Sequence, residues 1–164
     1  MKEAMLNRPV TIAVIDDNVE FGIGIKLMLA KDEVEIHTAG DGVEGLNLVS
    51  RLLPDIVLLD VVMPGMSGVE VCKEIRQIPE LSDILVVMLS GIKTHTDQMA
   101  EGLEAGADGY IARPIPNREL LARLRAYIRI KRSEKALKVA ENKYQRLFDT
   151  MIMAYAHHRI IQLW

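Results

Sequence analysis

Short apolar runs alternate along the chain with longer segments in which polar and apolar residues are mixed. Five such runs, rich in Val and Ile, span residues 10–15, 34–39, 56–59, 84–89 and 109–112. Continuous apolar runs of this length are typical of parallel strands that are covered on both faces. The alternation of strands and helices predicts an α/β fold with a parallel sheet and right-handed crossovers. In such sheets, functional groups gather at the carboxyl ends of the strands.

The segments between these runs carry signals for the starts of helices. In a capping box, a polar side chain at the helix start binds a backbone N–H three residues later, and an acidic residue there binds back. The chain offers three pairs with this spacing, the last in a looser form: Asp41 with Glu44, Ser67 with Glu70, and Thr94 with Asp97. Each pair predicts a helix start at the carboxyl end of a strand.

A different pattern begins after Ile128. Residues 130–151 contain no Gly or Pro and carry many charges. Two sets of residues recur there every seven positions and form one seam: Ile130, Leu137, Tyr144 and Met151, together with Ser133, Ala140, Leu147 and Ala154. Roughly three heptads are the minimum for a coiled coil, so the pattern predicts an extended helix that pairs with a second copy. One long amphipathic helix that folds back on the domain is the alternative.

Composition narrows the class of protein. The chain has 164 residues, of which 49% are hydrophobic and 26% charged, as in globular domains. A net charge of −3 argues against direct binding of nucleic acid, which needs clustered Lys and Arg. Cys72 is the only cysteine, so the chain cannot form a disulfide framework or a thiolate metal cage. The first residues lack the apolar core of a signal peptide and no run approaches membrane-spanning length, so we expect a cytoplasmic protein with no membrane contact.

Polar residues stand where the predicted strands end. Asp16 and Asp17 follow the first strand, Asp60 the third, Ser90 the fourth and Arg113 the fifth. A single Asp in such a place is most often a helix cap. Three carboxylates at one edge of the sheet repel one another, however, and a divalent cation with oxygen ligands would relieve this repulsion. Mg²⁺ suits a site of this composition.

A carboxylate beside such an ion can attack a phosphoryl group and form an aspartyl phosphate. The hydroxyl of Ser90 and the cation of Arg113 would then hold the phosphoryl oxygens. The residues at the strand ends therefore predict phosphoryl transfer to an aspartate.

Four motifs carry a resemblance to a known family: IAVIDDN, DIVLLDVVMPGMSGVEV, VVMLSG and GADGYIARPI. Together they resemble the response-regulator receiver domains of two-component signalling. The resemblance implies a flavodoxin-like (βα)5 doubly wound sheet of strand order 2-1-3-4-5, here with an extended C-terminal helix. We divide the chain into an N-terminal extension (1–8), a receiver domain (9–130) and a helical linker (131–164). Residues 141–164 also resemble a signalling helix and the beginning of a PAS domain.

The same resemblance implies roles for individual residues. Asp60 would be the phosphoacceptor, and Asp16 and Asp17 would hold Mg²⁺ together with Asp60 and the backbone carbonyl of Val62. Ser90 would be the switch hydroxyl and Tyr110 the switch aromatic residue. Such a domain is no enzyme in the usual sense, because it catalyses only its own phosphorylation and dephosphorylation. The implied partners are a sensor histidine kinase or phosphotransfer protein and a downstream output domain.

One position departs from the family pattern. Receivers have lysine where this chain has Arg113, and the two are not equivalent at a tight phosphate site, because arginine is longer, planar and forked. The resemblance also implies a cis peptide bond between Arg113 and Pro114. The alternative to a phosphorylated switch is a receiver-like interaction module in which Arg113 pairs permanently with Asp60.

Overall fold

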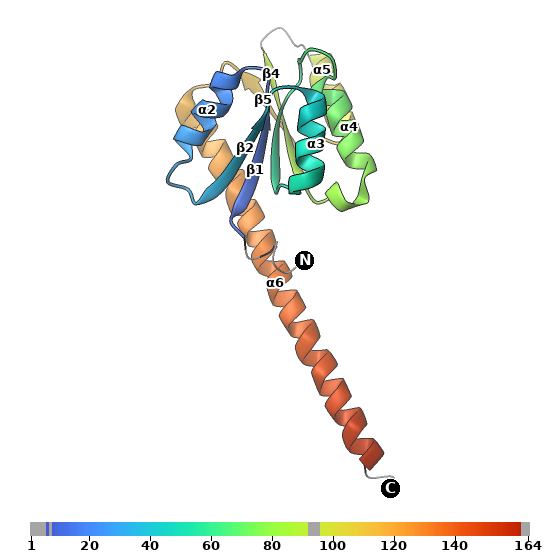
Figure 1. The fold of residues 1–164 in the computed structure, drawn as a ribbon. Coiled ribbons are helices and arrows are strands. Elements are labelled where there is room, and N and C mark those ends of the chain that lie inside the picture. Colours follow the sequence, from blue (N-terminus) through green and yellow to red (C-terminus); the bar gives the residue numbers. More distant parts are fainter. Residues whose placement is uncertain (1–5, 7, 92–95, 162–164) are drawn as a thin grey trace. The chain divides into compact units, whose positions relative to one another are not determined.

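The computed structural model describes residue 6 and residues 8–91 and 96–161, with side chains described for 6, 8–91 and 99–157. Five parallel strands form one sheet in the order β2-β1-β3-β4-β5, which confirms the predicted flavodoxin-like fold (Figure 1). The strands are β1 (Val10–Ile15), β2 (Val34–Ala39), β3 (Ile56–Asp60), β4 (Leu85–Gly91) and β5 (Gly109–Arg113). The helices are α2 (Val19–Met28), α3 (Gly42–Leu52), α4 (Gly68–Gln77), α5 (Thr96–Glu104) and α6 (Asn117–Ile161), with a short 3-10 turn, η1 (Pro79–Leu81).

The strands are buried on both faces, as their composition predicts. Side chains of β1 alternate between two clusters, with Ala13 and Ile15 on one face of the sheet and Ile12 and Val14 on the other. The first cluster continues into α3 and α4, and the second into α2 and the first turns of α6. Helices thus cover both faces of the sheet, while the carboxyl ends of its strands lie beyond these layers (Figure 1).

The predicted helix starts differ in detail. Ser67 and Glu70 form a complete capping box at α4, with both reciprocal hydrogen bonds present. Asp41 caps α3 by accepting a hydrogen bond from the Glu44 N–H, but the Glu44 carboxylate accepts from the N–H of Gly40 instead of that of Asp41. The pair of Thr94 and Asp97 lies outside the residues whose side chains are described.

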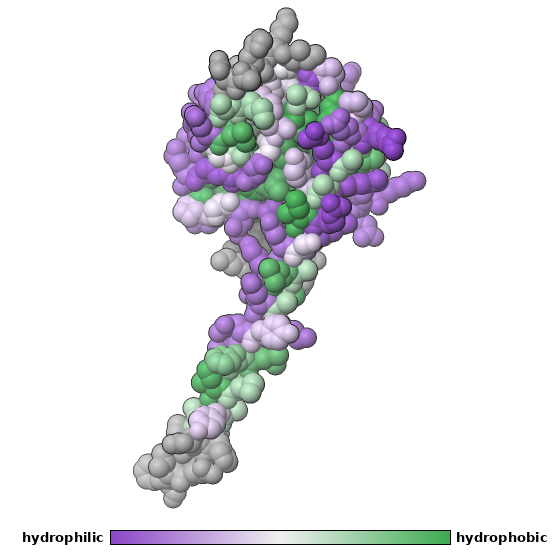
Figure 2. All heavy atoms as spheres, turned by 180° about the vertical axis from the view of Figure 1, so that it is seen from behind, coloured by the Kyte–Doolittle hydropathy of each residue, from purple (hydrophilic) through white to green (hydrophobic). Residues whose placement is uncertain are grey.

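The predicted extended helix is present as α6, which runs without interruption over 45 residues. The chain divides into two compact units, Pro9–Lys131 and a second that contains α6 from Arg132 onward. In this second unit the large seam side chains are exposed: Leu137, Tyr144, Leu147 and Met151. Figure 2 shows apolar side chains gathered on the surface of this part of the helix. Within the described residues, no helix combines the length and apolar character needed to cross a membrane.

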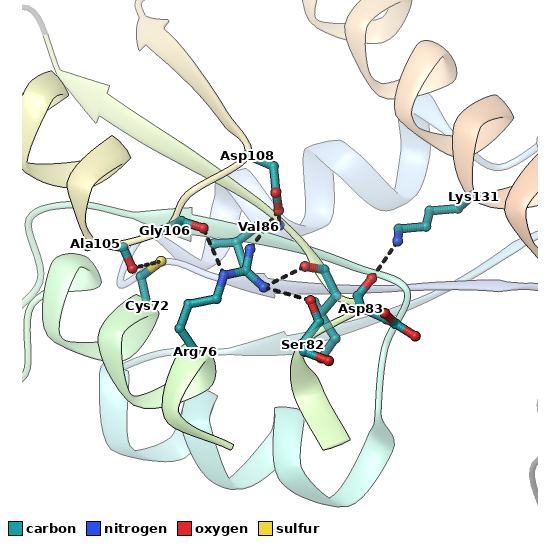
Figure 3. Close-up of polar contacts among 10 residues, drawn as sticks. Cys72, Arg76, Ser82, Asp83, Val86, Ala105, Gly106, Asp108 and Lys131 are labelled. Carbon is teal, nitrogen blue, oxygen red and sulfur yellow. Dashed lines mark hydrogen bonds and ion pairs between the residues drawn. The ribbon is translucent and has the colours of Figure 1, made fainter. Parts of the chain in front are cut away.

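Arg76 lies at the end of the sheet where β4 and β5 begin, opposite to the carboxyl ends of the strands (Figure 3). From the last turn of α4, its guanidinium donates to the carbonyls of Ile84, at 2.9 Å, and Gly106, at 2.8 Å. It also pairs at 2.6 Å with Asp108, whose same carboxylate oxygen accepts the N–H of Val86 at 2.8 Å. One side chain therefore ties together the segments that lead into β4 and β5.

Candidate functional site

The carboxyl ends of β1 and β3 bring three carboxylates together. Asp16 and Asp17 follow β1, and Asp60 is the last residue of β3. Each offers an oxygen atom, and these atoms lie within 4.8 Å of one another. Asp16 and Asp60 are 5% and 6% exposed, so water screens their mutual repulsion poorly, whereas Asp17 is exposed.

Arg113 supplies the positive charge that these carboxylates need. It is the last residue of β5, two strands away from Asp60 in the sheet. Its Nη1 donates to Oδ2 of Asp16 at 2.7 Å, and its Nη2 pairs with Oδ1 of Asp60 at 2.8 Å. The planar guanidinium thus spans two carboxylates at once, which a single ammonium nitrogen does less well.

Backbone N–H groups also donate hydrogen bonds to the two buried carboxylates. Oδ1 of Asp16 accepts the N–H of Asn18 at 2.9 Å, so both oxygens of this carboxylate are engaged. Oδ1 of Asp60 accepts the N–H of Val62 at 3.3 Å in addition to Arg113. Within the described part of the chain, Oδ2 of Asp60 takes part in no hydrogen bond.

Burial raises the pKa of the Asp60 carboxyl above its ordinary value, the charge of Arg113 acts in the opposite direction, and Asp16 reinforces the rise. Burial disfavours the charged form, and the nearby anion adds to this, while the guanidinium favours it. Burial and Asp16 thus raise the pKa of Asp60 while Arg113 lowers it, so a change in nearby charge would shift this pKa.

A glycine allows the chain after Asp60 to fold back on its strand. The N–H of Gly68, the first residue of α4, donates to the carbonyl of Val61 at 3.0 Å. A Cβ at Gly68 would lie 2.1 Å from the carbonyl oxygen of Asp60, closer than any side chain can approach. The start of α4 therefore packs directly against the backbone of the candidate phosphoacceptor.

The two residues expected to act as a switch lie near the site without joining its ion pairs. Ser90, in β4, is 1% exposed, and its hydroxyl donates to the carbonyl of Gly91 at 3.2 Å. The hydroxyl of Tyr110, in β5, is buried and has no hydrogen-bond partner among the described residues. The side chain of Val62 is 60% exposed. The peptide bond between Arg113 and Pro114 is cis, as the resemblance implies.

Two contacts were not anticipated from the sequence. One is the bond from Arg113 to Asp16, because the pattern suggested Asp60 as the partner of the arginine. The other is the ring of Phe21, in the first turn of α2, whose centroid lies 5.0 Å from Cζ of Arg113. This distance suits a cation–π interaction. The available signal was weak: an aromatic residue in the first helical turn after the Asp pair.

The donor set fits a hard divalent cation. Carboxylate oxygens are the ligands that Mg²⁺ prefers, and one or two of them with water and phosphate oxygens complete its shell. Asp16, Asp17 and Asp60 would hold the ion. The backbone carbonyl of Val62, two residues after Asp60, stays a predicted further ligand. The arrangement suits attack by a carboxylate on a phosphoryl group whose oxygens are held by cations.

Comparison with known proteins places most of this chain in one domain family. Residues 12–125 match the model of the response regulator receiver domain family. The chain is 40% identical over 118 residues to the DNA-binding response regulator MtrA of Mycolicibacterium paratuberculosis, covering 72% of this chain and 51% of that protein. It is 38% identical over 121 residues to the response regulator MprA of Mycobacterium sp. (strain KMS), covering 74% and 51%. The chain thus spans about half the length of the curated relatives that it matches.

Solved structures show the same similarity. A putative response regulator from Chloroflexus aurantiacus is 30% identical with a TM-score of 0.67, covering 74% of this chain and 98% of that one. The chemotaxis protein CheY4 of Vibrio cholerae is 27% identical with a TM-score of 0.66, covering 73% and 98%. In both cases the matched part of this chain corresponds to nearly the whole of the other.

Proposed function

We propose that this chain, which belongs to the response regulator receiver family of two-component systems, accepts a phosphoryl group on Asp60 in a Mg²⁺-dependent reaction. One observation carries the proposal: a nearly buried carboxylate ends β3 beside two further carboxylates, and one of its oxygens takes part in no hydrogen bond within the described residues. The phosphorylated domain then changes conformation through Ser90 and Tyr110 and controls an output domain or partner.

The residues around Asp60 have distinct parts in this reaction. Oδ2 of Asp60 attacks phosphorus and forms the new P–O bond, while the bond to the leaving group breaks and that group departs with its electron pair. Before the ion binds, Arg113 and the N–H of Val62 hold the other oxygen and orient the carboxylate. Mg²⁺, when bound, neutralises charge that develops on the phosphoryl oxygens. Ser90 hydrogen-bonds a phosphoryl oxygen after its hydroxyl leaves the carbonyl of Gly91.

Intact-mass spectrometry tests the proposal directly. Incubation with acetyl phosphate and Mg²⁺ is expected to add the mass of one phosphoryl group, and EDTA is expected to prevent the addition. Loss of the added mass on treatment with hydroxylamine identifies an acyl phosphate. A folded protein that remains unlabelled at saturating donor and ion would contradict the proposal.

The ion pair between Arg113 and Asp60 favours a second candidate. At 2.8 Å, with the Asp60 side chain 8% exposed, this pair could hold the site permanently closed. The chain would then be a receiver-like interaction module that is not switched by phosphorylation. The same labelling experiment separates the two, because only the first candidate gains mass.

Exposed apolar residues on α2 suit a helical partner such as a histidine kinase. Phe21, Ile25 and Met28 face the sheet, while Ile23 and Leu27 are 52% and 74% exposed. Apolar anchors one turn apart fit contact between helices. Ile23→Glu combined with Leu27→Glu is expected to slow phosphoryl transfer from the cognate kinase or phosphotransfer protein at least about tenfold, the effect of losing a modest hot spot. Labelling by acetyl phosphate should not change, and an equal loss with both donors would contradict the docking role.

The charges beside the heptad seam of α6 favour a parallel pair of copies. In the heptad frame, Arg129 and Lys143 occupy g positions, and Glu134 and Glu141 occupy e positions. A parallel pair places Arg129 beside Glu134 of the second copy, whereas an antiparallel pair opposes residues of like charge. We therefore propose a homodimer through a parallel coiled coil of α6.

Two neighbouring methionines test this dimer. Met151 lies on the seam and Met153 lies off it, and they are 70% and 72% exposed. Met151→Glu, alone or with Leu137→Glu, is expected to weaken self-association at least about tenfold, because a charge enters the seam. Met153→Glu should leave it unchanged. Sedimentation equilibrium measures both, and a monomeric native chain or equal effects of the two methionine variants would contradict the model.

The remaining partners follow from the family. We propose that the phosphorylated domain acts on an output segment or separate protein, and that this region itself, with its net charge of −3, binds no nucleic acid directly. A cytoplasmic location and the beginning of a PAS domain after residue 141 stay predictions.

A further inference from the structure

Arg113 and a divalent cation need the same carboxylate oxygens, and we propose that this competition, with Phe21 as the residue that positions Arg113, sets how readily the acidic pocket binds Mg²⁺. The inference rests on the proposed function, because it takes Mg²⁺ as the ion of the pocket. It assigns Arg113 a role before phosphorylation and gives Phe21 a role that the family pattern does not supply.

The first step concerns the oxygens of Asp16. Oδ1 accepts the N–H of Asn18 at 2.9 Å, and Oδ2 accepts Nη1 of Arg113 at 2.7 Å. With the side chain only 2% exposed, very little of this carboxylate faces solvent. An ion that uses Asp16 as a ligand therefore competes with these two donors for the carboxylate oxygens. Arg113 is the mobile one, since the N–H of Asn18 belongs to the backbone at the start of α2.

The second step concerns the fork of Arg113. Its two terminal nitrogens bind different carboxylates, Asp16 at 2.7 Å and Asp60 at 2.8 Å, so releasing one carboxylate disturbs the contact with the other. Hydrogen bonds between charged groups are among the stronger ones in proteins, and two in fixed geometry reinforce each other. The guanidinium thus serves as a built-in counterion for the two buried carboxylates.

The third step concerns Phe21. Its ring centroid lies 5.0 Å from Cζ of Arg113, and the ring packs against the buried cluster on the same face of the sheet. The ring is fixed by α2, so it offers the guanidinium a stationary surface that favours the cation. Because the side chain of Arg113 is 23% exposed, part of it would otherwise be free to move toward solvent. Phe21 therefore favours the pose in which Arg113 blocks the ion.

The test is the affinity for Mg²⁺, measured by isothermal titration calorimetry on the whole chain without a phosphodonor. Arg113→Lys is expected to bind Mg²⁺ at least about 5-fold more tightly than the native protein, the lower end for coupled sites, because one ammonium holds the two carboxylates less well than the forked guanidinium does. Arg125→Lys is the matched control, because Arg125 makes a forked pair with Asp32, from Nε and Nη2, away from the pocket. Its affinity should equal that of the native chain.

The role of Phe21 has its own variants. Phe21→Leu is expected to raise the affinity for Mg²⁺ by a smaller factor than Arg113→Lys, since Arg113 remains but loses its aromatic surface. Phe21→Tyr keeps the ring and should restore the native affinity, which a merely structural role would not require. Phe148→Leu removes an exposed ring from α6 and should have no effect. Circular dichroism checks that each variant is folded.

The outcomes separate this inference from the proposed function. Unchanged or weaker Mg²⁺ binding in Arg113→Lys, in a folded protein, would overturn the competition, even if acetyl phosphate labels Asp60. Tyrosine and leucine at position 21 giving the same affinity would overturn the role of the ring. The expected order of affinities without any labelling would support the competition while the proposed function fails.

Discussion

Asp60→Asn is expected to reduce phosphoryl uptake from acetyl phosphate to the background of the assay. An amide is a poor nucleophile, so the attack on phosphorus is lost while the shape of the residue is kept. The carboxylate also provides one of the three oxygen sites that lie within 4.8 Å of one another, so Mg²⁺ binding should weaken in parallel. Intact mass after incubation with donor and ion measures the uptake.

Asp41→Asn is the matched control for this variant. Asp41 lies just after β2, at the same edge of the sheet, and caps α3 through a 2.8 Å hydrogen bond from the Glu44 N–H. Asparagine caps a helix about as well as aspartate, so the fold and the labelling should both persist. Full labelling of Asp60→Asn, with the added mass mapped to another residue, would show that the nucleophile has been assigned wrongly.

Gly68→Ala is expected to lower the free energy of unfolding by about 3 kcal/mol, the upper part of the range for overpacking. The added Cβ would lie 2.1 Å from the carbonyl oxygen of Asp60, and the backbone there cannot yield without moving the candidate phosphoacceptor. Chemical denaturation monitored by circular dichroism measures the loss. Labelling of the folded fraction should fall as well, because Asp60 is displaced.

Gly24→Ala provides the opposite expectation. Gly24 lies inside α2, and nothing lies within 4 Å of the Cβ that alanine would add. Alanine is the better helix former, so this variant should stabilise the protein by about 0.5–1 kcal/mol. A Gly68→Ala variant as stable as the native chain would show that the start of α4 can move away from Asp60 at little cost.

The sequence predicted the sheet well because the signal for a buried parallel strand is local. The runs at β1 and β2 match the strands residue for residue. The fourth run begins one residue before β4 and ends two residues short of its last residue. Its start differs because the N–H of Ile84 bonds to the carbonyl of Leu81 in the preceding turn instead of joining the sheet. Strand ends are set by such turns, which hydrophobicity does not reveal.

The grouping of the site residues could be predicted, but not the contacts among them. Parallel strands place their carboxyl ends at one edge, so Asp16, Asp60 and Arg113 were expected near one another. Which carboxylate an arginine reaches depends on side-chain torsions and on neighbours such as Phe21, and these depend on tertiary packing. The long helix α6 was predictable from its heptads, whereas pairing with a second copy involves a molecule that the chain alone does not contain.

The two arginines near the ends of β5 differ in what can release them. Arg76 binds mainly backbone carbonyls in front of β4 and β5, such as those of Ile84 and Gly106, and a dissolved cation cannot readily replace it there. Arg113, at the far end of β5, binds carboxylates, which a metal ion or a phosphoryl group can take over. The segment before β5 is therefore held by contacts that an ion cannot readily replace, whereas the carboxyl end of β5 is held by contacts that an ion can replace. A ligand that takes over these carboxylates would therefore free Arg113 at the carboxyl end of β5, while Arg76 still anchors the segment that leads into the strand.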